Sequence, residues 1–318
     1  MNSTADWYRR AARELAQTSE LQVGWALEVA GRDDLLALID ELPRAHRQPS
    51  LLFSVARYLG APTEAFADWL VAEWPRVAPV AAERLTQTNE ALRCAPLVAA
   101  LERITEPDEP IALIEIGASA GLCLAPERYS YAFATGESIV RLGSGGPLLE
   151  CTVTGGSAPA RLPLVAWRRG LDLRPLDVRS ADDRAWLEAL LPPDRPERTA
   201  RLREAVAVLR EDPPPIVAGD AADALPALLA QVPRGMRAVV VSLGTLVYLP
   251  RPARERVLDA VAAHGASLVT LEAESLLAHL VAPRAALTAP EPTPFLLAAD
   301  GVPLACATPR GGRLSWLT

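Results

Sequence analysis

The segment IALIEIGASAGL, residues 111–122, holds the residue types that could do chemistry in this sequence. Its centre, Gly117-Ala118-Ser119-Ala120-Gly121, matches G-x-S-x-G, the turn that exposes a nucleophilic serine in α/β-hydrolases. The same turn follows an apolar run, which is where nucleotide-binding proteins place a glycine loop. Ser119 is therefore either a nucleophile or a small residue in a loop that a ligand approaches closely.

Glu115 favours the second interpretation, because it is a charged residue in an otherwise apolar strand predicted over residues 111–117. Burying a carboxylate costs free energy unless a partner or a ligand compensates for it. A serine nucleophile does not require this carboxylate, whereas a loop that binds a cationic amino group does. We expect Gly117 and Gly121 to allow a tight turn, and a helix after them to offer its N–H groups.

Two further acidic residues follow predicted strands. Asp172, in WRRGLDLRPLDV, is suited to accept hydrogen bonds from a ribose diol. It lies much farther after Gly121 than the usual roughly 20 residues, so an insertion is required, and residues 129–163 are expected to form it as an added hairpin. Asp220 and Ala221 follow PPPIV, where the aspartate either accepts from an adenine amino group or caps the next helix.

A third group of polar residues lies in TQTNEALR, which we expect to continue a helix. Helical spacing would place Glu90 and Arg93 on one face. That face is either solvated, with an ion pair between these two residues, or it is a wall of an active-site cleft. In the cleft, Gln87 and Asn89 would face a substrate and Arg93 would bind a carboxylate. Tyr248, after a later strand, either faces the substrate or belongs to the core.

A serine hydrolase also needs a histidine and an acid after its nucleophile. His264, at the end of a predicted helix, and His279 are the histidines that follow Ser119. However, only helices are expected before Ser119, whereas several strands precede the serine in a hydrolase. The four cysteines form no C-x-x-C pair and no histidine lies in H-E-x-x-H, so no metal site is expected.

Composition excludes several classes of protein. Half of the 318 residues are apolar, but no apolar run reaches the ~20 residues of a membrane span. The net charge is −7, and all 32 basic residues are arginine, so neither a Schiff-base lysine nor nucleic-acid binding is expected. The first 20 residues lack the apolar core of a signal peptide. We expect a cytoplasmic protein without a membrane partner, and the sequence indicates no particular oligomeric state.

The order of predicted elements indicates an α/β fold. Residues 1–105 show only helical patterns, and residues 106–318 alternate between strands and helices. Such alternation predicts a mostly parallel sheet that is covered on both faces. Two β-rich runs after residue 294 predict an antiparallel pair at one end of this sheet.

Four segments, IEIGASAGL, GLDLRPLD, AGDAADALPALL and VVVSLGTLVYLPRPARERVLDAV, resemble successive motifs of class I S-adenosylmethionine-dependent methyltransferases. More narrowly, TQTNEALRCAPL, EIGASAGL, RRGLDLRPLDV and the segment ending in YLP resemble the domain of unknown function 2332 family. The resemblance covers nearly the whole chain. It implies a Rossmann-like methyltransferase domain over residues 106–318 beside an N-terminal helical cap, residues 1–105.

The resemblance also implies a cofactor, S-adenosylmethionine, and a small molecule as methyl acceptor. It assigns the methionine amino group to Glu115, the ribose to Asp172, and the adenine to Asp220 and Ala221. It assigns the glycine loop to Gly117, Ala118, Ser119 and Gly121, and the substrate side to Gln87, Asn89, Glu90, Arg93 and Tyr248. Two alternatives stay open: a non-catalytic nucleotide-binding or regulatory protein of this fold, and a serine esterase that uses Ser119.

Overall fold

The chain forms two compact units. The computed structural model describes three stretches of the chain, residues 3–87, 89–277 and 295–317. The first unit consists of residues 1–88 and 179–200, and the second consists of residues 89–178 and 201–318. The helix-only pattern expected before residue 105 is present, but α7 (Cys94–Ile104) packs with the second unit.

The first unit is helical. Its core contains an aromatic cluster in which Trp25 stacks on Phe66, with ring centroids 4.1 Å apart, while Phe53 meets both rings edge-on. Because these rings are fully or almost fully buried, they supply much of the apolar area that this small unit removes from water. Its helices are α1 (Thr4–Leu15), α2 (Glu20–Ala30), α3 (Asp33–Glu41), η1 (Arg44–His46), α4 (Pro49–Tyr58), α5 (Phe66–Ala72), α6 (Trp74–Glu83) and α8 (Ala181–Ala189).

The second unit is built on one mixed, mostly parallel sheet of eleven strands, in the order β3-β2-β4-β11-β10-β9-β8-β7-β1-β5-β6. The strands are β1 (Pro110–Ile116), β2 (Ser130–Thr135), β3 (Ser138–Leu142), β4 (Leu148–Thr154), β5 (Leu164–Asp172), β6 (Ile216–Ala218), β7 (Arg237–Leu243), β8 (Ser267–Ala273), β9 (Phe295–Ala299), β10 (Val302–Ala307) and β11 (Arg313–Trp316).

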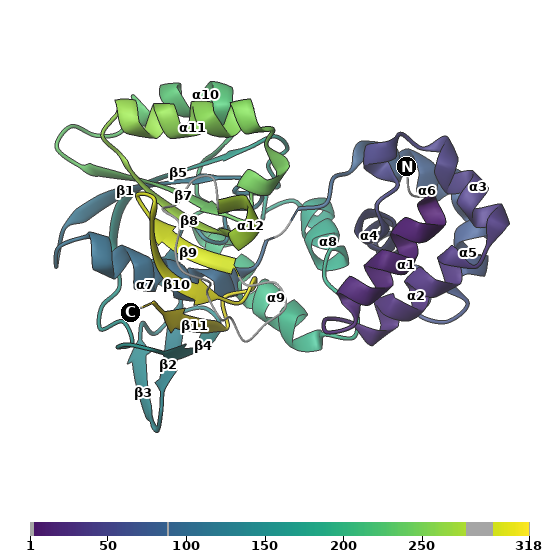
Figure 1. Ribbon diagram of the computed structural model, residues 1–318, viewed down its shortest axis with the longest axis horizontal. Helices are drawn as coiled ribbons and strands as arrows, with labels where there is room; N and C mark the ends of the chain where they lie inside the picture. The colour runs from purple at the N-terminus through teal and green to yellow at the C-terminus, as the bar shows by residue number, and fades with distance from the viewer. Residues whose placement is uncertain (1–2, 88, 278–294, 318) are drawn as a thin grey trace. The chain divides into compact units, whose positions relative to one another are not determined.

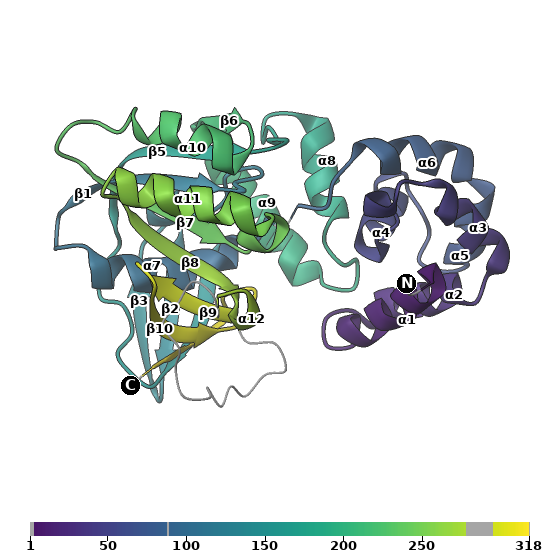
Figure 2. The same cartoon turned by 45° about the horizontal axis from the view of Figure 1, so that its top comes forward.

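Five adjacent strands, β6-β5-β1-β7-β8, are all parallel, so their carboxyl ends meet at one edge. Their order reverses at β1, because the chain continues to β5 on one side and later to β7 on the other. Helices α10 (Ala221–Leu229) and α11 (Arg251–Ala263) lie side by side over one face (Figures 1 and 2). The opposite face meets α7, which packs against β8 and β9.

Local sequence signals account for these elements. Every residue of β1 after Pro110 is buried, as expected of a parallel strand covered on both faces. Asp220 and Ser180 cap α10 and α8, and a proline opens α4. The remaining helices are η2 (Ala91–Arg93), η3 (Pro126–Arg128), α9 (Pro196–Glu211), η4 (Leu246–Tyr248) and α12 (Glu274–Leu277). None of the helices in the described residues is long and apolar enough to cross a membrane.

Two expectations about helices are wrong. The predicted continuous helix through TQTNEALR is wrong, because residues 84–87, 89 and 90 are not helical and Ala91–Arg93 forms only the short η2. Glu90 and Arg93 therefore do not share a helical face. The glycine turn is also not followed by a helix: turns and the short η3 lead directly into β2. No helix N-terminus is thus available at this turn.

Two expectations about strands need correction as well. The insertion over residues 129–163 contains the hairpin β2–β3, but it adds a third strand, β4, parallel to β2. The β-rich end contains three strands instead of two, and β9, β10 and β11 join β8 to β4 in the middle of the sheet. The sheet therefore continues past the predicted end through strands of the insertion.

Candidate functional site

The glycine turn after β1 is fastened to the end of the neighbouring strand β5. The Asp172 carboxylate accepts the Ser119 N–H through Oδ2 and the Arg174 N–H through Oδ1, both at 2.8 Å. The Leu171 carbonyl accepts the Gly117 N–H at 2.7 Å. The sequence-predicted residues Ser119, Gly117 and Asp172 are thus brought together at the carboxyl edge, with Asp172 holding the turn.

Both glycines of this turn are required by close contacts. Gly117 and Gly121 have φ angles of +71° and +77°, and Ser119 between them also has a positive φ of +51°. A Cβ on Gly117 would overlap the Thr245 side chain, and one on Gly121 would lie 2.7 Å from a Pro214 ring carbon. The turn is therefore wedged between the segment after β7 and the segment before β6.

Ala118 and Ala120, the other small residues of the turn, are almost completely buried. Ala118 donates its N–H to the Leu171 carbonyl at 3.2 Å. A side chain on Gly170 of β5 would lie 2.8 Å from the Ala118 methyl group, so the turn and β5 approach each other closely. This packing explains why small residues occupy the turn.

Glu115 is a buried carboxylate of the site that forms no salt bridge with the described residues. It is 5% exposed, and among the described residues no hydrogen bond reaches its Oε2. Burial raises the pKa of the Glu115 carboxyl well above its usual value, although the positive charge of Arg93 acts in the other direction. Ser119 Oγ and Asn89 Nδ2 are also buried without a partner. Buried polar atoms are rarely left this way, so they indicate a site for water or a ligand.

Arg93 is a buried cation that is held by backbone carbonyls. It is 7% exposed, donates from Nε to the Pro309 carbonyl at 2.9 Å, and donates from Nη1 to the Leu243 carbonyl. Burial lowers the pKa of its guanidinium. Within the described part of the chain it forms no ion pair with a carboxylate, so its charge is balanced by carbonyl dipoles, by the Phe295 ring at 6.0 Å and by more distant groups.

Glu90 pairs with Arg201 and not with Arg93. Its Oε1 lies 3.1 Å from Nε of Arg201, and the Glu90 side chain is only 5% exposed. The Cys123 thiol donates to the Glu90 carbonyl at 3.6 Å, which connects this segment to the chain just after the glycine turn. The predicted ion pair between Glu90 and Arg93 is therefore wrong, because Glu90 precedes the three-residue helix η2 and its carboxylate meets Arg201.

The other predicted residues have simpler surroundings. Asp220 accepts the Ala222 N–H at 2.8 Å and caps α10, as the helix-cap interpretation expects, and Ala221 joins the hydrophobic core. Tyr248, at the end of η4, is 70% exposed. Gln87 belongs to the first unit, so only the residues from Asn89 onward share a unit with the sheet.

Sequence reasoning missed Glu272, a further carboxylate at this edge, whose Oε2 has no hydrogen-bond partner within the described residues, as is also true of Glu115. Glu272 is fully buried near the end of β8, and its Oε1 accepts from the Ser242 hydroxyl at 2.7 Å. Burial raises the pKa of this carboxyl, while the bonds it accepts act in the other direction. Its signal in the sequence is the same as that of Glu115: a charged residue in the apolar strand SLVTLEA.

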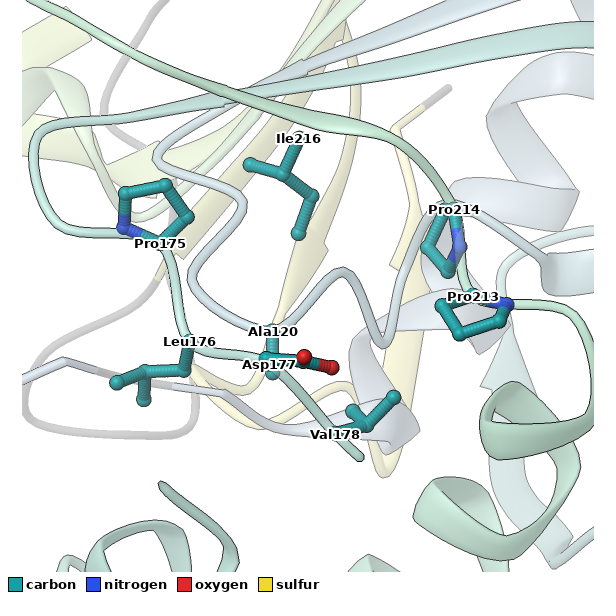
Figure 3. Close-up of a pocket in the computed structure, with 8 residues that line it drawn as sticks. All are labelled: Ala120, Pro175, Leu176, Asp177, Val178, Pro213, Pro214 and Ile216. Carbon is teal, nitrogen blue, oxygen red and sulfur yellow. The ribbon is translucent and has the colours of Figure 1, made fainter. Parts of the chain in front are cut away.

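A cavity of about 200 Å³ lies beside the glycine turn, but it does not include the polar residues above. Figure 3 shows Pro175 on one side of the cavity, Pro213 and Pro214 on the other, and Asp177 as its one ionisable lining residue. It is smaller than the roughly 300–1,000 Å³ typical of ligand pockets, and its walls are mostly apolar. The unpaired polar atoms of the carboxyl edge are therefore the stronger candidate site.

The serine-hydrolase arrangement gains no support from the histidine that the structure describes. His264 ends α11, just before the amino end of β8, whereas Ser119 follows the carboxyl end of β1. These two ends lie at opposite edges of a parallel sheet. His279 lies outside the described residues. Across residues 3–87, 89–277 and 295–317, no group of three or more His, Cys, Asp or Glu side chains could hold a metal ion.

A comparison with protein families gives one match. The family model described as "Uncharacterized protein conserved in bacteria (DUF2332)" matches residues 56–316, which is most of the chain. No curated protein and no solved structure matches the chain. The family description names no activity, so the resemblance to methyltransferases stays a hypothesis.

The contact between Gly244 and Arg93 generates a first prediction. A Cβ on Gly244 would lie 2.8 Å from Nη1 of Arg93, and Gly244 has a φ of +85°. Gly244→Ala should lower the free energy of unfolding by more than the roughly 1–3 kcal/mol that a strained backbone conformation costs alone. Thermal and urea denaturation would measure the loss.

Gly235→Ala is the matched control for this variant. Gly235 has a similar φ of +79°, but no atom lies within 4 Å of the position of its Cβ. It should therefore show only the backbone cost. Equal losses in the two variants would mean that Arg93 moves aside freely and that its position is not fixed.

Proposed function

Because the chain belongs to the DUF2332 family, whose description names no reaction, we propose its function from its own residues: it binds S-adenosylmethionine at the carboxyl edge and transfers the methyl group to a small molecule. The order of the five parallel strands supports this proposal. In doubly wound Rossmann-like sheets, ligands bind at the carboxyl ends where the strand order reverses. Here the order reverses at β1, next to Glu115 and the glycine turn.

The buried carboxylate of Glu115, whose Oε2 has no hydrogen-bond partner within the described residues, carries the proposal. A carboxylate that is 95% buried is costly, and a bound ammonium group would compensate for it. S-adenosylmethionine offers an ammonium group, a carboxylate and a ribose diol. Glu115 suits the first of these and Arg93 suits the second, because Arg93 is a buried cation without an ion pair to a described carboxylate.

The missing helix after the glycine turn narrows the choice of ligand. Dinucleotides place a pyrophosphate on the N-terminus of that helix, where N–H groups and the helix dipole compensate for its charge. The chain from Gly121 to β2 offers no such helix, and the chain contains no lysine. S-adenosylmethionine carries no phosphate, so it does not require this element.

Asp172 and Ser119 would act by fixing the conformation of the glycine turn. The Asp172 carboxylate fixes the turn through the Ser119 N–H, so a ligand would meet a backbone whose conformation is already set. When bound, S-adenosylmethionine would supply an electrophilic methyl group on sulfur. The chain would then mainly hold an acceptor in line with that group. Tyr248 is the predicted residue best exposed to contact an acceptor.

A second candidate function is a binding or regulatory protein that uses the same ligand without transferring its methyl group. Two observations favour it. The Asp172 carboxylate already accepts two backbone N–H groups, and Asp220 already caps α10. Neither group is therefore fully available for the roles that the methyltransferase resemblance implies.

Calorimetric titration with S-adenosylmethionine and S-adenosylhomocysteine tests the proposal. We expect saturable binding to the wild-type protein. Glu115→Gln should weaken it roughly 10–100-fold, because a hydrogen bond to a charged group contributes about 1.5–3 kcal/mol. Glu150→Gln, at an exposed position of β4, is the matched control and should bind normally.

The outcomes separate the two candidate functions. The absence of binding to well-folded wild-type protein would refute both. Binding that is sensitive to Glu115→Gln, with transfer of labelled methyl to a small-molecule acceptor, would support the methyltransferase. The same binding without transfer to any acceptor in a broad panel would favour the regulatory protein.

Glu115 should also reduce the stability of the ligand-free protein. Its raised pKa means that the folded state binds the proton more tightly than the unfolded chain does. The free energy of unfolding of the wild type therefore falls as the pH rises above the ordinary glutamate value of about 4.3. Glu115→Gln lacks this loss, so its melting temperature should exceed that of the wild type at pH 8.

The difference in melting temperature should shrink as the pH falls towards the ordinary glutamate value, because protonation of the folded wild-type carboxyl removes the cost of its buried charge. Melting temperatures of the wild type and of Glu115→Gln across this pH range would measure the difference. A Glu115→Gln protein that is less stable than the wild type at every pH would show that the carboxylate has a structural partner, and would remove the main support for a ligand there.

A further inference from the structure

Glu272 binds the whole turn that follows β7. Its Oε1 accepts three consecutive backbone N–H groups, at 3.1 Å from Gly244, 2.8 Å from Thr245 and 2.9 Å from Leu246. It also accepts the Ser242 hydroxyl at 2.7 Å. Glu272 is fully buried, and the hydrogen bonds from Gly244 and Thr245 are partly buried.

Consecutive N–H groups that converge on one anion form a nest, an arrangement that usually binds phosphates and other anions. In this turn the anion is a side chain of the protein itself. Hydrogen bonds to a charged acceptor are roughly twice as strong as neutral ones. Without Glu272 the buried donors of this turn would lack their acceptor, so the carboxylate determines the path of residues 244–246.

The same turn contacts the candidate site at two points. The Thr245 side chain fills the space above Gly117, where even a Cβ would overlap it. Gly244 lies against the Arg93 guanidinium, whose Nη1 donates to the Leu243 carbonyl. A movement of this turn would therefore shift both the glycine turn and Arg93.

We propose that Glu272 is a positioning residue of the ligand site: by holding residues 244–246, it fixes the glycine turn through Thr245 and the Arg93 guanidinium through Gly244. It acts without touching the ligand. The effect of Glu272 on ligand affinity rests on the proposed function. The mechanical link between the two turns is independent of that function.

Hydrogen exchange of the ligand-free protein tests the link directly. Glu272→Gln keeps the volume of the side chain but removes its charge and turns part of the acceptor into a donor. We expect amide exchange of residues 244–246 to accelerate roughly 10-fold or more, and that of residues 117–121 to accelerate as well, while the core strands stay protected. Acceleration confined to residues 244–246 would overturn the proposal.

Two further variants keep the test decisive if Glu272→Gln folds poorly. Ser242→Ala removes one donor and leaves the nest intact, so exchange in both turns should stay close to that of the wild type. Thr245→Ala keeps its own N–H on Glu272 but removes the side-chain atoms beside Gly117. It should accelerate exchange at residues 117–121 only, and unchanged exchange there would overturn the proposal.

Titration of the same variants with S-adenosylhomocysteine adds the functional readout. Glu272→Gln and Thr245→Ala should weaken binding roughly 10-fold, about 1.4 kcal/mol, whereas Ser242→Ala should not. Full affinity in Glu272→Gln would overturn a role in positioning the ligand. If the wild type binds no adenosyl ligand while the exchange results hold, the proposed function fails and the link between the turns stands.

Discussion

The free-energy cost of burying charge among apolar strands determines how the carboxyl edge of this sheet is built. Three of the buried charged groups there are compensated in different ways. Glu272 is surrounded by backbone N–H groups, Glu90 meets Arg201, and Arg93 donates to backbone carbonyls. The Oε2 atoms of Glu115 and Glu272 both lack a hydrogen-bond partner within the described residues, but Glu272 accepts four hydrogen bonds through its Oε1.

These contacts also connect segments that are far apart in the sequence. The glycine turn is held from one side by Asp172 at the end of β5 and from the other by Thr245 after β7. Such interlocking turns cannot move independently, because each fills the space that the other would need. A ligand bound at this edge would meet a surface that is already ordered, and it would lose little affinity to the ordering of loops.

Much of the parallel half of the sheet could be predicted from the sequence, because strands buried on both faces appear as apolar runs and Asp220 marks a helix start. The pairing of Glu90 with Arg201 could not, since nothing local relates residues so far apart. The break in TQTNEALR had a weak signal in its threonines and asparagine, which are poor helix formers. Glu272 was detectable by the reasoning that singled out Glu115, a charge in an apolar strand.

The parallel pairing of β11 with β4 has a consequence for folding. It joins residues 313–315 to residues 152–154, so roughly half of the chain must be gathered before this contact can form. Pairing over such a distance carries a large loop-closure entropy, and it is slow compared with the hairpin β2–β3. During synthesis, the edge of β4 that β11 covers would stay without this partner until residues 313–315 have been made, and in the meantime it is open to pairing with another chain.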